Sequence, residues 1–259
     1  MAVAIRTKQE IERIRAAGKI VAQVLDRLRQ VVNVGVTTGQ LDQISTEIIT
    51  QAGGVPLFKG VTNAQAKFDF PASICASVNE QVVHGVPGPR KLIDGDIISI
   101  DCGVKLNGYC GDSATTIGVG NVASETRTLL DVTYEVLEIA LKEAKNGVYW
   151  SHVAQRMQEH AESMGYGIVR DYVGHGIGRK MHEDPRLPNY VNQELLDNDL
   201  LLRKGMVLAV EPMLNMGTYK TRVLDDGWTV VTSDGKPAAH FEHTLTITEN
   251  GAQVLTNLY

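Results

Sequence analysis

Apolar residues recur with two different periods along the chain, and the change of period divides it into segments. Between residues 8 and 31 they repeat every three to four positions, which predicts an amphipathic helix. Thr7 and Glu10 form the sequence pattern of a capping box at its start. A second helix is expected to begin near Thr38 and to stop at Gly53.

The same order of elements is expected again further along the chain. A long helix is predicted over 124–146 and a shorter one over 151–164. Segments typical of strands and turns occupy 55–120, between the two helix pairs, and the remainder after the second pair.

Weak internal similarity suggests that these two parts are related. A shift of 112 positions, the spacing from Gly35 to Gly147, aligns Gly35-Val36 with Gly147-Val148, Leu41 with Val153, Gln43 with Gln155, and Gly53 with Gly165. We therefore expect two related halves, about 8–120 and 124–250, of the α+β class, with helices on one side of an antiparallel sheet. No linker-like segment separates them, which favours a single domain over 1–259.

One predicted hairpin carries two carboxylates where its strands pair. The stretch SIDCGVKLNGYCGDSA, residues 99–114, reads as two strands joined at Asn107-Gly108, a strong hairpin pattern. With this turn Asp101 and Asp112 lie on one face of the ladder. At about 5 Å and an effective dielectric near 20, their repulsion is roughly 3 kcal/mol. Two interpretations stay open: a solvated hairpin with surface aspartates, or a site for a cation.

The second part of the chain holds further candidate ligands. His175 and His182 stand in the glycine-rich stretch YVGHGIGRKMHEDP, although a lone histidine is more often structural than a ligand. Glu211 lies inside the apolar segment VLAVEPML, and Glu242 heads the alternating segment HFEHTLTIT. Carboxylates are rarely buried unless they are paired or bind metal. Either glutamate could still face water at a strand end.

Taken together, these residues form an oxygen-rich set with one imidazole: Asp101, Asp112, His175, Glu211 and Glu242. The set is too large for one tetrahedral zinc, but it suits two divalent cations such as manganese, iron, cobalt or zinc, with bridging carboxylates. Paired metals bind a hydroxide between them and polarise a carbonyl. The chemistry that this implies is hydrolysis.

Composition and charge exclude other classes of protein. The 259 residues are 43% hydrophobic and 21% charged, as in ordinary globular proteins. A net charge of -5 without a dense basic run argues against nucleic acid as a partner. With neither a signal peptide nor a long apolar stretch, we expect a cytoplasmic protein that does not contact membranes. Three cysteines, Cys75, Cys102 and Cys110, without a CxxC pair argue against a disulfide framework and a thiolate zinc site.

Six segments resemble, in order and spacing, the successive motifs of a type I methionine aminopeptidase of the short bacterial type. They are SVNEQVVHGVPG, GDIISIDCG, YCGDSATTIGVG, GHGIGRKMHEDP, GMVLAVEPML and HFEHTLTITENG. The resemblance covers nearly all of the chain from about residue 8. It implies the pita-bread fold, in which two pseudo-symmetric halves surround a dinuclear metal centre.

The resemblance also implies roles for individual residues. The metal ligands would be Asp101, Asp112, His175, Glu211 and Glu242. Glu211 would shuttle the proton of the attacking water, while His84 and His182 would contact the scissile peptide and its transition state. The methionine pocket would be lined by Phe70, Cys75, Met181 and Trp228. Met181 departs from the pattern, since several bacterial members carry an aromatic residue at that position. Phe70 also departs from it, since some members carry a tyrosine there.

By resemblance, the reaction is metal-dependent removal of an N-terminal methionine, preferentially when the second residue is small, by a bridging hydroxide. The implied protein is a monomer whose partners are peptides and nascent chains that begin with Met, with the ribosome as a further candidate.

Two enzyme classes and one non-catalytic class are the alternatives. Proline-specific peptidases generally add a large N-terminal domain. Type II methionine aminopeptidases carry a long insertion between the two glutamate ligands, whereas Glu211 and Glu242 are close together in this sequence. Relatives that only bind proteins or nucleic acid have typically lost ligands, whereas all five are present.

The remaining histidines are expected to be structural, and Cys110 a packing residue; these histidines are His152, His160, His240 and His243.

Overall fold

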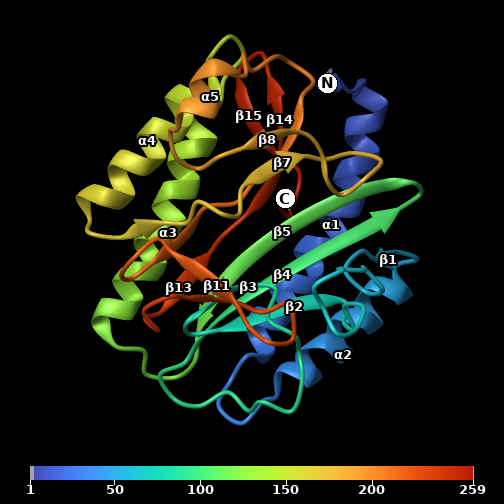
Figure 1. Cartoon of the computed structure of the whole chain (residues 1–259). Helices are drawn as coiled ribbons and strands as arrows, with labels where there is room; N and C mark the ends of the chain where they lie inside the picture. Colours follow the sequence, from blue (N-terminus) through green and yellow to red (C-terminus); the bar gives the residue numbers. More distant parts are fainter. Residues whose placement is uncertain (1–2, 259) are drawn as a thin grey trace.

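The computed structural model describes residues 3–258 and contains helices and antiparallel strands, so the expected α+β class is confirmed (Figure 1). The first part of the chain forms α1 (Lys8–Val31), α2 (Thr38–Gln51), β1 (Val55–Pro56), β2 (Ile74–Val78), β3 (Gln81–Val83), β4 (Ile97–Leu106) and β5 (Tyr109–Gly118). The second part forms α3 (Ser124–Glu143), α4 (Trp150–Ser163), β6 (Gly167–Ile168), β7 (Gly174–Gly176), β8 (Glu183–Leu187), α5 (Gln193–Asp197), β9 (Val207–Val210), β10 (Met213–Asn215), β11 (Thr221–Val223), β12 (Val230–Thr232), β13 (Ala238–His240), β14 (His243–Thr248) and β15 (Gly251–Val254).

Helix α1 begins at the expected capping box. Thr7 accepts a hydrogen bond from the backbone of Glu10, and the Glu10 carboxylate accepts one from the backbone of Thr7 at 3.0 Å. Helix α2 has the same device, formed by Thr37 and Gln40. None of the described helices is long and apolar enough to span a bilayer.

Two details of the predicted elements are wrong. Helix α3 ends at Glu143 rather than at 146, because Ala144 turns to an extended conformation and Gly147 then donates its N–H to the Leu202 carbonyl at 2.8 Å. Helix α5 lies where only strands were expected. The Asn192 side chain caps it locally by accepting from the Leu195 N–H at 2.8 Å.

The hairpin of β4 and β5 has the expected turn and register. Asn107 and Gly108 both have positive φ angles, 49° and 81°, as a type I′ turn requires. Asp101 pairs with Ala114, and Asp112 pairs with Gly103. Since paired residues share a face, the two aspartates lie on the same face as diagonal neighbours, as the hairpin pattern predicted.

Each helix pair covers strands of its own half. Apolar side chains of α1 and α2 pack with β2 and β4 in one core cluster, and those of α3 and α4 pack with β9, β10 and β14 in another. The two groups of helices lie on the outside of the molecule, with the strands between them (Figure 1). The sheets of the two halves meet where Asp112 N donates to Thr244 Oγ1 at 3.1 Å and Glu242 N donates to the Ala114 carbonyl at 3.0 Å.

Helix α1 approaches β5 closely at a pair of glycines. A Cβ atom at Gly111 would lie 2.6 Å from the backbone nitrogen of Gly18, closer than packed atoms come. Gly18 in turn lies against the Leu255 carbonyl, where a Cβ would meet oxygen at 2.4 Å. This contact fixes the helix against the strand next to Asp112.

We expect Gly111→Ala to lower the free energy of unfolding by about 1 to 3 kcal/mol, because the added methyl group forces helix and strand apart. Denaturant unfolding of the two proteins measures the difference. Gly88→Ala is the matched control, since a Cβ there meets nothing within 4 Å, and it should change the free energy by less than about 0.5 kcal/mol. Equal stability of the two variants would show that the glycine contact is not tight.

Candidate metal centre

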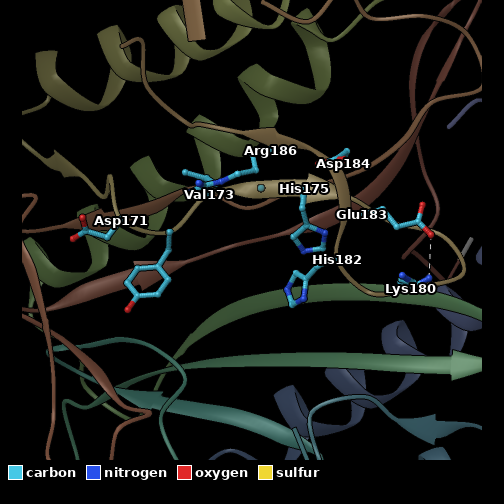
Figure 2. Close-up of a pocket in the computed structure, with 10 residues that line it drawn as sticks. Asp171, Val173, His175, Lys180, His182, Glu183, Asp184 and Arg186 are labelled. Carbon is cyan, nitrogen blue, oxygen red and sulfur yellow. Dashed lines mark hydrogen bonds between the residues drawn. The ribbon is translucent and has the colours of Figure 1, made fainter. Parts of the chain in front are cut away.

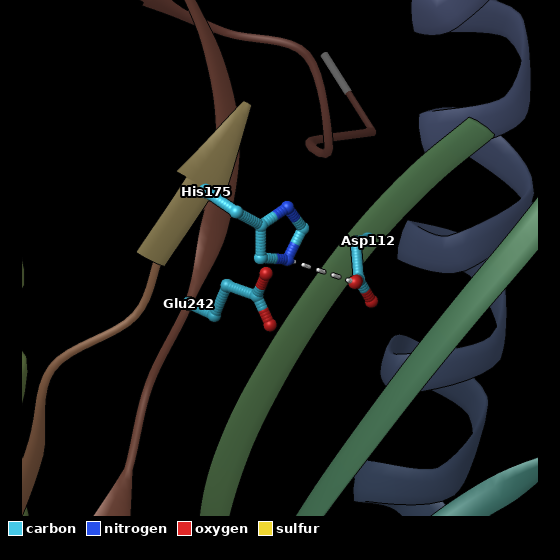
Figure 3. Close-up of side chains that lie close together, drawn as sticks. All are labelled: Asp112, His175 and Glu242. Carbon is cyan, nitrogen blue, oxygen red and sulfur yellow. Dashed lines mark ion pairs between the residues drawn. The ribbon is translucent and has the colours of Figure 1, made fainter. Parts of the chain in front are cut away.

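Five strands or strand ends bring the predicted ligands to one place. Asp101 lies on β4, Asp112 on β5 and His175 on β7, whereas Glu211 directly follows β9 and Glu242 directly precedes β14. Figure 3 shows Asp112, His175 and Glu242 pointing toward one another from three separate elements. The ligands therefore come from both halves of the chain.

Three of these side chains are close enough to share one ion. One ligand atom from each of Asp112, His175 and Glu242 lies within 4.8 Å of the other two. Glu211 adjoins this group, with its Oε1 3.5 Å from His175 Nε2, and Asp112 Oδ2 is 4.0 Å from the same nitrogen. Asp101 lies diagonally across the β4–β5 ladder from Asp112, and its charge raises the pKa values of Asp112, Glu211 and Glu242.

Several carboxylate oxygens in this cluster are buried without a partner. Asp101 Oδ1, Asp112 Oδ1 and Glu242 Oε1 accept no hydrogen bond. Among the ion pairs formed within residues 3–258, none joins a lysine or arginine to any of the four carboxylates. Buried polar atoms are normally satisfied. Orphaned oxygens beside one imidazole are the donors that divalent first-row metals take, so these residues fit a pair of cations.

The protein's own groups disfavour ionisation of the cluster. Burial raises the pKa of Asp101 to about 7. Burial, and then the charges of neighbouring carboxylates, raise the pKa values of Asp112, Glu211 and Glu242 well above their usual range. A nearby positive charge would reverse these shifts, because it favours the deprotonated form.

His175 is held in the tautomer that a metal ligand needs. Its Nδ1 lies 2.9 Å from the Gly176 carbonyl, so this nitrogen carries the proton and donates it. Nε2 then presents its lone pair toward Asp112 and Glu211. Burial, followed by the nearby His182, lowers the pKa of His175 to about 4, and the ring is neutral at pH 7.

Of the two other predicted histidines, His182 adjoins the cluster. The ring of His182 lies 4.4 Å from that of His175, between centroids (Figure 2). His84 has a φ of 58°, a strained conformation for a residue with a side chain, and its ring meets Tyr172 edge-on. Burial lowers the pKa of both rings, that of His84 to about 4, so both are neutral N–H donors at pH 7.

The predicted pocket residues form one apolar cluster. Phe70 and Cys75 are buried in it, and Met181 and Trp228 pack against it from the side. Phe70 and Trp228 meet edge-on with ring centroids 5.2 Å apart. The cluster has further members that the sequence analysis missed: Phe58, Ala72 and Val86. They stand in turn-rich segments without apolar periodicity, so no local pattern marked them.

A cavity of about 720 Å³ opens beside His175 and His182. Its walls include His175, His182, Tyr172, Lys180 and Arg186 (Figure 2). The cavity therefore gives solvent access to His175 and His182.

The histidines expected to be structural have other surroundings. His160 and His152 face Glu135 and Glu143 at 2.7 and 3.6 Å near the surface. His243 Nδ1 lies 2.9 Å from Thr256 Oγ1, whereas His240 is buried and its Nε2 has no partner. Cys110 is buried on the aspartate-bearing face of β5, and its Sγ lies 3.6 Å from the Arg179 carbonyl.

The chain matches the model of metallopeptidase family M24 over residues 12–249. It is 46% identical to a methionine aminopeptidase of Clostridium perfringens and 47% identical to methionine aminopeptidase 1 of Bacillus subtilis, over 98% of each chain in both cases. The crystal structure of a methionine aminopeptidase from Thermotoga maritima superposes with a TM-score of 0.92 at 44% identity, covering 99% of this chain and 100% of that one.

A more distant structure shares the fold alone. The prolidase from Pyrococcus furiosus has a TM-score of 0.76 at 24% identity, and the match spans 98% of this chain but 65% of the prolidase. The expected pita-bread fold is thereby confirmed. The chain belongs to metallopeptidase family M24 and, within that family, to the methionine aminopeptidases.

Proposed function

We propose that this protein hydrolyses the peptide bond after an N-terminal methionine, preferentially when the second residue is small, with two divalent cations. The observation that carries the proposal is the group of four carboxylates around His175, with buried oxygens that lack partners. It lies beside two neutral histidines and an apolar cluster. The names of the close relatives point to the same reaction.

The residues that would hold the cations are Asp101, Asp112, His175, Glu211 and Glu242. When bound, a pair of divalent ions acidifies a water molecule and polarises the scissile carbonyl. The free α-amine of a substrate is a further ligand for such an ion, which would restrict cleavage to the first residue.

The proton of the attacking water would go to Glu211. Glu211 is partly exposed, whereas Glu242 is buried, so Glu211 is the more accessible carboxylate of the two. A carboxylate within reach of the attacking water can act as a general base. Glu211 would later pass the proton to the leaving amine.

The two histidines would act on the peptide itself. His182, next to His175, would donate a hydrogen bond to the developing oxyanion, an interaction worth about 3 to 4 kcal/mol per donor. His84, whose ring meets Tyr172 edge-on, would hydrogen-bond to the scissile peptide. Both donors are neutral at pH 7 and keep their N–H groups.

The apolar cluster would bind the methionine side chain. A flexible thioether packs well against aromatic rings and sulfur. Phe70, Cys75, Met181 and Trp228 provide such a surface.

All five proposed ligands come from one chain, so the site is complete in a monomer. Because they come from both parts, about 8–120 and 124–250, we treat 1–259 as one catalytic domain. Nascent chains are the main source of N-terminal methionine. We therefore place the protein in the cytoplasm, with the ribosome as an expected partner.

Metal removal tests the proposal directly. We expect chelator-treated protein to release no methionine from a Met-Gly-Met peptide, and added manganese or cobalt to restore release. Asp112→Asn should lower the restored rate at least about 100-fold, beyond the usual effect of groups that only support a ligand. His160→Ala, at the surface, should leave the rate unchanged. If no divalent metal ever restores release, the protein is a binding module and not this enzyme.

A second prediction concerns stability and pH. His84 and His175 have a pKa near 4 in the folded protein and near 6.5 in the unfolded chain. Above pH 6.5 they therefore add little to the pH dependence of the free energy of unfolding. The cluster carboxylates have folded pKa values raised above their unfolded values near 4, to about 7 for Asp101. The unfolded chain therefore binds fewer protons, and the free energy of unfolding of metal-free protein falls as pH rises.

We expect the Tm of chelated protein to fall from pH 6.5 to 8. At pH 8, chelated Asp112→Asn should melt at least about 2 °C above chelated wild type, because it removes a buried carboxyl whose ionisation the folded state disfavours. With manganese the order should reverse. A higher Tm for chelated wild type at pH 8 would contradict the proposed repulsion.

The third prediction concerns the methionine pocket. Phe70→Ala should lower kcat/KM for Met-Gly-Met by about 10- to 200-fold, as lost apolar contacts do. Phe68→Ala is the matched control, since this residue is 46% exposed, and it should have little effect. Equal kcat/KM values for the two variants would place the methionine side chain elsewhere.

A further inference from the structure

The loop that carries His182 is held by one carboxylate. Glu183 directly follows this histidine, and its Oε1 accepts hydrogen bonds from the backbone N–H groups of Arg179 at 2.8 Å and Lys180 at 3.0 Å. Figure 2 shows the bond to Lys180 and the ring of His182 facing His175. The second oxygen, Oε2, accepts from the guanidinium of Arg6.

Arg6 comes from the segment before α1, far from Glu183 in sequence. Its backbone N–H donates to the Gly205 carbonyl at 2.8 Å, which fixes the segment. Its guanidinium covers Gly178, where a Cβ would meet Nη2 at 2.2 Å. The side chains of Arg6 and Glu183 are 11% and 18% exposed, so solvent screens their ion pair little.

A second attachment fixes the other end of the loop. Cys110 N donates to the Gly178 carbonyl at 2.8 Å, on the same strand as Asp112. The loop is thus joined on one side to the strand that carries a proposed metal ligand, and on the other side to Arg6. No ionic contact other than that with Arg6 is formed by the Glu183 carboxylate within residues 3–258.

We propose that Arg6 and Glu183 are positioning residues for His182. The inference rests on the proposed function, in which His182 donates to the oxyanion. Glu183 shapes the turn by accepting two hydrogen bonds from backbone N–H groups. Arg6 fixes the orientation of the Glu183 carboxylate by a charge-assisted hydrogen bond. Neither side chain needs to touch the substrate, because both act through the place of the His182 ring.

Steady-state kinetics with Met-Gly-Met and saturating manganese test this assignment. Arg6→Met should lower kcat about 10- to 100-fold, the range for groups that orient a functional side chain. KM should change less than about 3-fold, because oxyanion stabilisation acts on the transition state. Arg6→Lys keeps the positive charge and should retain kcat within about 3-fold. Arg27→Met, at an exposed arginine of the following helix α1, should behave as wild type.

A double-mutant cycle separates positioning from a general structural effect. In a His182→Ala background, Arg6→Met should lower kcat further by less than about 2-fold, since the group that it positions is absent. An equal loss in both backgrounds would overturn the proposal, as would an Arg6→Met enzyme with the kcat of Arg27→Met.

Thermal melts show whether Arg6→Met is folded. If it is not, Glu183→Gln replaces it in the same cycle, because the amide keeps an acceptor for the loop but cannot accept from Arg6. Additive losses for that variant would likewise overturn the proposal. Wild-type protein that releases no methionine with any metal refutes the proposed function itself, whereas active wild type with unaffected variants refutes this inference alone.

Discussion

The mutual repulsion of four carboxylates in a poorly solvated place is the constraint on which the rest of this structure depends. Asp101, Asp112, Glu211 and Glu242 are held by separate strands, and no lysine or arginine in the described chain pairs with them. Such an arrangement disfavours folding unless positive charge joins it. Divalent cations are the neutralising groups that match the orphaned oxygens and the lone pair of His175.

The architecture brings this charge together by joining the first and second parts of the chain. The hairpin of β4 and β5 supplies two aspartates, and the sheet of the second half supplies the histidine and the glutamates. Hydrogen bonds between Asp112 and Thr244 connect the halves at the cluster itself, so neither half alone contains the site.

Local patterns in the sequence predicted the elements whose cause is local. The Asn107-Gly108 turn determined the register of the hairpin, and helical periodicity identified α1 to α4. Helix α5 was not predicted, because five residues are too few to show a helical period of apolar residues. The resemblance to a known family assigned the proposed ligands, but contacts between distant segments left no local pattern. The pairing of Arg6 with Glu183 and the place of Phe58 in the apolar cluster could only be found in three dimensions.

The most direct test of the central claim is a crystal structure of the manganese-loaded protein with anomalous diffraction data. The account predicts two anomalous peaks about 3.5 to 4 Å apart, among the oxygens of Asp112 and Glu242. A cluster without any peak, with its carboxylates in the same places, would contradict the claim that paired cations make this arrangement of charge tolerable.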